Sequence, residues 1–131
     1  MTEEMVPIFR AEDAAKTAKW YAHLGFEVVG EHRFAPELPL YLFLECGDAH
    51  LHLSEHTGDA TPNTLVYFWV DDVDSIATEF SVNVKDQPWA REIELTDPDG
   101  NRLRIATGHW PSPKDRSPTT GDNLLDLICF F

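Results

Sequence analysis

Two stretches of the chain show the same order of hydrophobic and polar positions. Each begins with a short apolar run typical of a β-strand, over residues 6–10 and 65–70. An acidic residue follows, Asp13 or Asp72, and then an amphipathic segment with apolar residues at helical spacing. The two aspartates lie 59 positions apart (72 − 13 = 59), as do the first residues of the two runs. The pattern predicts an internal repeat of a strand followed by a capped helix.

Further strands are predicted after each helix. They cover residues 26–34, 38–45 and 49–55 in the first repeat and 91–97 and 101–107 in the second, with a weaker candidate at 82–84. Tight turns at 46–48 and 98–100 join the last two strands of each repeat. We therefore predict an α+β fold of two βαβββ modules, the second trimmed. They should form a curved, mainly antiparallel sheet around a cleft, with the helices on the outer face.

The composition changes near residue 108. Residues 1–107 are expected to form one domain, with modules at about 5–57 and 63–107. Residues 108–131 read as a Pro-rich linker and an apolar tail, LLDLICFF. Such a tail is an aggregation hazard in water, so it should dock on the body or on a partner subunit, or else cover a ligand groove.

Charge and composition narrow the function classes. The 131 residues carry a formal net charge of −13, which argues against binding nucleic acid or an anionic membrane surface. No apolar run approaches the length of a membrane span, and the first residues lack a secretory signal pattern. Two cysteines are too few for a disulfide framework. These features favour a cytoplasmic protein with reduced thiols.

Three stretches resemble the vicinal oxygen chelate superfamily, which includes glyoxalase I, extradiol dioxygenases and bleomycin-resistance proteins. They are AEDAAKTAKWYAHLGFEV (11–28), VDDVDSIATEF (70–80) and QPWAREIELTDPDGNRLRI (87–105). The last is most similar to bleomycin-resistance proteins. The resemblance implies this fold over about residues 5–107, but it does not fix an activity, because one scaffold hosts many chemistries.

Metal-dependent members of the superfamily carry four ligands on cleft-facing strands. The resemblance places these positions at Val6, His52, Leu65 and Arg104. Only the histidine is a usual ligand for a divalent metal, and the arginine would repel one. We therefore expect no metal and no other cofactor. A displaced site using His50, His52 and Glu94 is the rival interpretation.

The same alignment indicates which strand faces line the cleft, because residues two apart share a face. Apolar residues fill the opposite positions, including Phe9, Leu53, Phe68, Ile93 and Ile105, and should pack under the helices. Eight side chains of the cleft and its bordering loops are candidates for ligand binding: Phe34, His52, Tyr67, Trp69, Trp89, Glu92, Glu94 and Arg104. Glu92 and Glu94 could meet a cation on the ligand, or could instead pair with Arg104.

The leading hypothesis is a metal-independent binding protein of the bleomycin-resistance type. It would sequester a cationic or aromatic small molecule, such as an antibiotic, in the groove of a homodimer, as the resemblance implies. Two alternatives stay open. One is a metal-dependent lyase, isomerase or dioxygenase with rearranged ligands, and the other is a scaffold whose cleft is filled by its own tail. No nucleophile motif, phosphate-binding loop or dinucleotide fingerprint is present.

Overall fold

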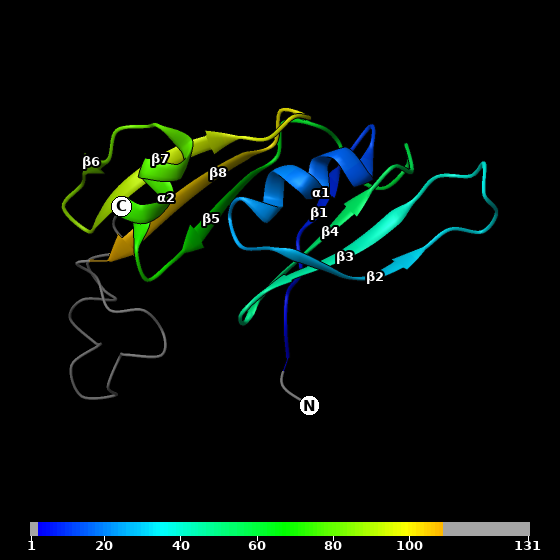
Figure 1. Ribbon diagram of the computed structural model, residues 1–131, viewed down its shortest axis with the longest axis horizontal. Coiled ribbons are helices and arrows are strands. Elements are labelled where there is room, and N and C mark those ends of the chain that lie inside the picture. The colour runs from blue at the N-terminus through cyan, green and yellow to red at the C-terminus, as the bar shows by residue number, and fades with distance from the viewer. Residues whose placement is uncertain (1–2, 109–131) are drawn as a thin grey trace.

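The computed structural model describes residues 3–108. The predicted linker and apolar tail lie outside the described residues, apart from Gly108. Within residues 3–108, no helix is long and apolar enough to span a membrane. Two modules of the predicted order lie side by side, with the first coloured blue to green and the second green to orange in Figure 1.

The first module contains one helix and a four-stranded sheet of order β1-β4-β3-β2. Its elements are β1 (Ile8–Arg10), α1 (Ala14–Ala22), β2 (Glu27–His32), β3 (Tyr41–Cys46) and β4 (Ala49–Ser54). The pair β1–β4 is parallel, and the other two pairs are antiparallel. The turn between β3 and β4 takes only two residues, and Gly47 adopts the positive φ (60°) that this turn requires.

The second module repeats this order in a second sheet, β5-β8-β7-β6. Its elements are β5 (Leu65–Trp69), α2 (Val73–Phe80), β6 (Lys85–Asp86), β7 (Ala90–Thr96) and β8 (Arg102–Gly108). Again β5–β8 is parallel and the other pairs are antiparallel, so the predicted α+β fold of two mainly antiparallel modules is confirmed. The weak strand candidate at 82–84 is wrong: this sequence packs on the core as a connection, and pairing begins only at Lys85.

Both helices begin where the sequence predicts, and for the same physical reasons. The side chains of Asp13 and Asp72 each accept a hydrogen bond from a first-turn amide (3.2 Å). A residue at or just after the end of each module's final strand supplies a second cap. Glu55 accepts a hydrogen bond from the amide of Ala14 (2.8 Å), and Thr107 from that of Val73 (2.8 Å). Each helix is thereby fixed to its own sheet.

One hydrophobic core joins the two modules. The predicted helix-side residues of both sheets are buried or pack against this core, which confirms the inferred strand faces. Aromatic pairs cross between the modules, with ring centroids 5.3 Å apart for Trp20 and Phe80 and 5.6 Å for Phe26 and Phe68. The helix-bearing faces therefore share a core, and the opposite face of each sheet is left accessible.

A buried polar cluster also fastens the modules together. The turn between β7 and β8 reaches α1, where Tyr21 donates a hydrogen bond to Asp97 (2.7 Å) and Thr17 donates one to Asp99 (2.6 Å). Asn101, which is fully buried, donates to the carbonyl of Arg10 (3.0 Å) and to Asp97 (3.1 Å). The Asp-Pro-Asp-Gly-Asn sequence that signals a hairpin thus also positions one module on the other.

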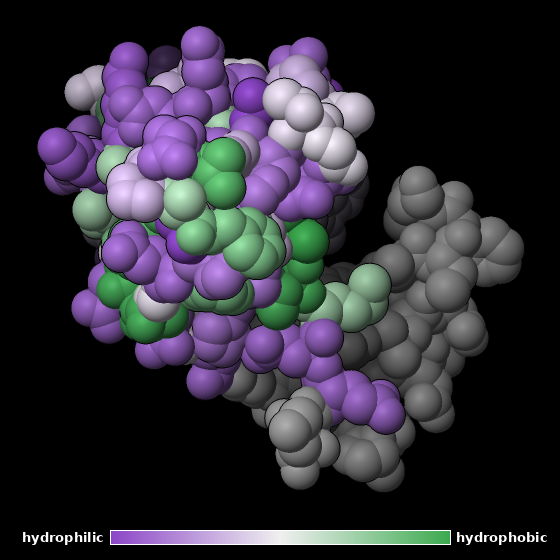
Figure 2. Space-filling model, turned by 90° about the vertical axis from the view of Figure 1, so that its right-hand side faces the viewer, coloured by the Kyte–Doolittle hydropathy of each residue, from purple (hydrophilic) through white to green (hydrophobic). Residues whose placement is uncertain are grey.

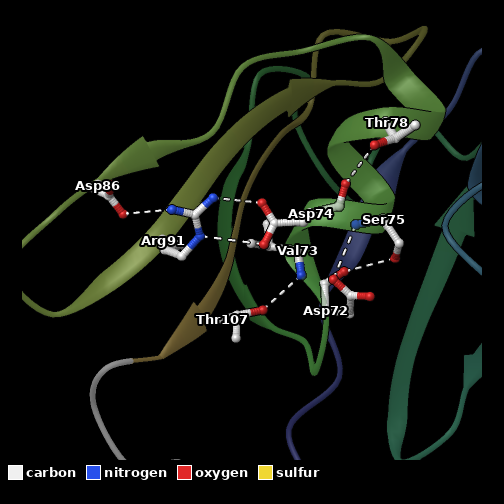
Figure 3. Close-up of polar contacts among 8 residues, drawn as sticks. All are labelled: Asp72, Val73, Asp74, Ser75, Thr78, Asp86, Arg91 and Thr107. Atoms are coloured by element: carbon white, nitrogen blue, oxygen red, sulfur yellow. Dashed lines mark hydrogen bonds and ion pairs between the residues drawn. The ribbon is translucent and has the colours of Figure 1, made fainter.

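On the outer side of the second module, an arginine connects three elements. Arg91 of β7 forms ion pairs with Asp74 of α2 (2.7 Å) and Asp86 of β6 (3.1 Å), as Figure 3 shows. The Arg91 guanidinium lowers the pKa of the Asp74 carboxyl, chiefly through their hydrogen bond. This surface network orients α2 and lies on the helix side of the module, away from the accessible sheet face.

Candidate functional site

Six of the eight predicted binding residues belong to the accessible face of the second sheet or to its border. Tyr67 and Trp69 lie on β5 and remain 39% and 37% exposed, which is unusual for large aromatic side chains on a sheet. Glu92 and Glu94 project from β7 and Arg104 from β8, and Trp89 precedes β7. Their assignment to one face follows from the register, which aligns Tyr67 with Arg104 and Arg104 with Glu94.

Hydrogen bonds hold the aromatic side chains in place. Tyr67 donates its hydroxyl proton to Glu92 (2.6 Å), and the indole of Trp89 donates to the same hydroxyl oxygen (3.2 Å). The rings of Tyr67 and Trp69 pack with centroids 5.0 Å apart. Burial and the Glu92 hydrogen bond raise the pKa of Tyr67 to about 12, so the hydroxyl stays protonated at neutral pH. The result is a fixed aromatic surface on which a flat ligand can stack.

The charged residues on this face are paired with each other. Glu94 lies between two guanidinium groups, at 3.3 Å from Arg104 Nε and 3.6 Å from Arg102 Nη1. Glu92 is engaged by the tyrosine hydroxyl. Pairing with Arg104, one of the two roles considered for these carboxylates, is thus present for Glu94, while Glu92 accepts from Tyr67 instead. All these groups are partly exposed, so each pair contributes little to stability and can rearrange around a ligand at low cost.

The two other predicted residues lie elsewhere. His52 is on the accessible face of the first sheet, where it pairs with Ile8 of β1 and Phe43 of β3. Phe34 lies in the β2–β3 loop, 75% exposed, with its ring edge-to-face on His32 at 4.5 Å. The end of the molecule that carries the β2–β3 loop shows apolar residues scattered among polar ones (Figures 1 and 2). The eight candidates therefore divide between two sheet faces.

Sequence reasoning missed two aromatic residues beside His52. Tyr41 hydrogen-bonds to His52 Nδ1 (2.8 Å), and the Phe43 ring packs on the imidazole at 4.7 Å. Odd-numbered and even-numbered positions within residues 38–45 are both mostly apolar. Alternation alone therefore does not reveal which sheet face Tyr41 and Phe43 occupy. The two-residue turn would have revealed the face, because a turn of this length pairs Cys46 with Ala49 and thereby places Phe43 opposite His52.

A small hollow is lined by residues of both modules. It encloses about 200 Å³ and is lined by Met5 and Pro7, by His50 of β4, by Tyr67 of β5 and by core side chains. Pockets for drug-sized ligands enclose roughly 300–1,000 Å³. The hollow alone is therefore too small for such a ligand.

The residues at the superfamily's metal positions do not fit a metal. Val6 and Leu65 offer no donor atom, and Arg104 is cationic. Nor does any group of three or more His, Cys, Asp or Glu side chains within residues 3–108 lie where it could hold a metal ion. The rival set of His50, His52 and Glu94 is split between the two sheets.

Several solved structures share this fold. A bleomycin-binding protein in complex with bleomycin is 24% identical (TM-score 0.63), and the match covers 81% of this chain and 98% of that one. The bleomycin-binding protein of bleomycin-producing Streptomyces verticillus, bound to copper(II)-bleomycin, is 26% identical (TM-score 0.61; 83% and 100%). A lactoylglutathione lyase from Agrobacterium tumefaciens is 19% identical (TM-score 0.60; 82% and 95%).

These neighbours include both binding proteins and an enzyme, so the shared fold does not choose between them. No curated protein sequence matches the chain. The profile of the glyoxalase superfamily matches residues 1–109, which is the whole repeated body. The chain therefore belongs to the glyoxalase superfamily, as its vicinal-oxygen-chelate repeat indicates.

Proposed function

We propose that this protein binds and sequesters a small aromatic molecule without transforming it. The observation that carries the proposal is the Tyr67–Trp69 surface on β5, exposed yet fixed by the Trp89–Tyr67–Glu92 hydrogen bonds. A rigid aromatic surface stacks a planar ligand with little loss of side-chain entropy. The bleomycin-binding neighbours support a ligand of antibiotic type.

The ligand groove is proposed to form between two copies of the chain. The hollow within one chain is small, while Leu65, Tyr67 and Trp69 of β5 and Ile8 of β1 are left about 40% exposed. Both strands are also sheet edges, each pairing on one side only. A second copy would cover these apolar side chains and enlarge the groove. Sedimentation velocity should then give twice the 14.9 kDa chain mass at micromolar concentration.

Calorimetric titration with metal-free bleomycin and a panel of planar aromatic antibiotics tests the binding proposal. Trp69→Ala should weaken binding of a confirmed ligand by about 1–3 kcal/mol, as truncation of a central aromatic anchor does. Trp69→Phe should retain most of the affinity because it keeps a stacking surface. Lys19→Ala, on the exposed side of α1, is the control expected to bind normally.

Two results would reject the proposal. One is the absence of saturable binding across the panel, with tryptophan fluorescence unchanged. The other is a ligand whose affinity is the same for the parent protein and Trp69→Ala, because binding would then occur away from the β5 surface.

A further inference from the structure

The accessible face of the first sheet differs chemically from that of the second. One row of residues crosses all four of its strands in register: Gly30, Phe43, His52 and Ile8. The corresponding row of the second sheet is Tyr67, Arg104 and Glu94. The first row carries an imidazole and no carboxylate or guanidinium, whereas the second row carries one carboxylate and one guanidinium.

Local packing gives this row a shaped surface. The ring of Phe43 leans over Gly30, where an added Cβ would lie only 3.2 Å from the ring. The imidazole of His52 stands edge-to-face on Phe43, with an interplanar angle of 80°. A larger residue at position 30 would displace the phenyl ring. The glycine therefore lets Phe43 and His52 form one continuous surface.

The hydroxyl of Tyr41 is close enough to the imidazole to influence which of the two ring nitrogens carries the proton. Its hydroxyl lies 2.8 Å from Nδ1 of His52. A phenol is a good proton donor, and when it donates to Nδ1 the single proton of the neutral ring must reside on Nε2. Nε2 is then a hydrogen-bond donor at the edge of the aromatic surface.

The surroundings of His52 favour the neutral ring. Burial lowers the pKa of His52, and the neighbouring His50 lowers it further, while Glu4 opposes the shift. His50 is itself engaged by Glu4 (3.0 Å) and Glu45 (3.3 Å). The nearest cation on β1, Arg10, donates to the carbonyls of Ala11 and Ser54. The row that contains His52 and Phe43 thus offers one neutral N–H group beside apolar side chains.

We propose that this face recognises a planar, uncharged ring that carries a hydrogen-bond acceptor, with His52 Nε2–H as the donor and Tyr41 as the residue that positions it. The inference rests on the proposed function and narrows its ligand class. A ring nitrogen or carbonyl oxygen of the ligand would accept this proton while its π-surface contacts Phe43 and Ile8. A cationic group on the same ligand would instead contact the accessible face of the second sheet.

The first test needs no ligand. Long-range ¹H–¹⁵N correlation spectra of the full chain should show His52 in its Nε2–H tautomer near pH 7.5. Tyr41→Phe should raise the Nδ1–H fraction, because the donor to Nδ1 is lost. Tyr21→Phe, which removes a hydroxyl buried under α1, should leave the His52 signals unchanged. A predominant Nδ1–H tautomer in the parent protein would overturn the proposal, whatever the protein is later found to bind.

The second test compares two fragments of the same shape, pyridine and benzene. Both are uncharged at pH 7.5, and only pyridine has an acceptor. NMR titration should show pyridine binding at His52 about fivefold more tightly, the effect of one neutral hydrogen bond. Tyr41→Phe should reduce this ratio toward one. Equal affinities in the parent protein would contradict the assigned donor, even if both fragments bind.

Discussion

Removing the hydroxyl of Tyr21 tests the junction between the two modules. Tyr21 is fully buried and donates to Asp97, which is 4% exposed. A hydrogen bond to a charged group contributes roughly 1.5–3 kcal/mol. Tyr21→Phe keeps the ring packing, and Asp97 still accepts from Asn101 and from the amides of residues 99 and 101. We therefore expect the free energy of unfolding to fall by about 2 kcal/mol at pH 7.

The pH dependence provides a sharper signature. Burial and the nearby Asp97 carboxylate raise the pKa of Tyr21 far above its ordinary value of 10.0. The folded protein thus holds this proton more tightly than the unfolded chain does. The resulting stability is fully present below pH 10 and is lost above it, by up to about 1.4 kcal/mol per pH unit. The phenylalanine variant has no proton to lose, so its disadvantage should shrink by about 1 kcal/mol by pH 11.

Urea denaturation followed by circular dichroism, at pH 7 and pH 11, measures both effects. The other tyrosines titrate in both proteins and cancel in the difference. The reasoning would be refuted if the variant lost less than about 0.5 kcal/mol at pH 7, or if the difference were the same at both pH values.

Three further substitutions test the local geometry, each by denaturant unfolding. Ser81 ends α2 with φ at 55°, so Ser81→Gly should raise the unfolding free energy by about 0.5–1 kcal/mol, and no gain would argue against backbone strain there. Gly100→Ala should lower the unfolding free energy by about 1–2 kcal/mol, because φ at this position is 88° and the new Cβ would lie 2.5 Å from Asn63 Oδ1. An unchanged stability would mean that the turn relaxes freely. Arg91→Met should leave the unfolding free energy nearly unchanged, since its ion pairs are exposed, and a clear loss of stability would show that α2 depends on them.

Much of the fold was predictable because its signals are local. Asp13 and Asp72 start the helices through their own side chains, and the alternation over residues 92–95 and 102–105 separates core from accessible positions. The strand at 82–84 was misplaced because its two valines pack on the core from an irregular connection. A two-residue strand such as β6 carries too little pattern to locate.

The strand face that each candidate side chain occupies was predictable on one sheet and only partly on the other. Tyr67, Trp69, Glu92 and Glu94 lie on strands whose parity is clear. The partners of these residues were not predictable, because side-chain hydrogen bonds such as Trp89 to Tyr67 depend on rotamers and loop path. On β3, apolar residues at both parities hid the face of Tyr41. There only strand register, a long-range property, distinguishes the two faces.

The attachment of α1 at both ends has a consequence for how the repeats unfold. Asp99 binds the start of the helix through Thr17, while His23 near its end pairs with Glu79 of α2 (2.9 Å). Neither module can therefore melt without exposing core and polar groups of the other. A half-length fragment would lack the core side chains that the other module contributes, so we expect the duplicated sequence to unfold as one cooperative unit in calorimetry. Its van't Hoff and calorimetric enthalpies should agree, although the amino-acid pattern is that of two separate repeats.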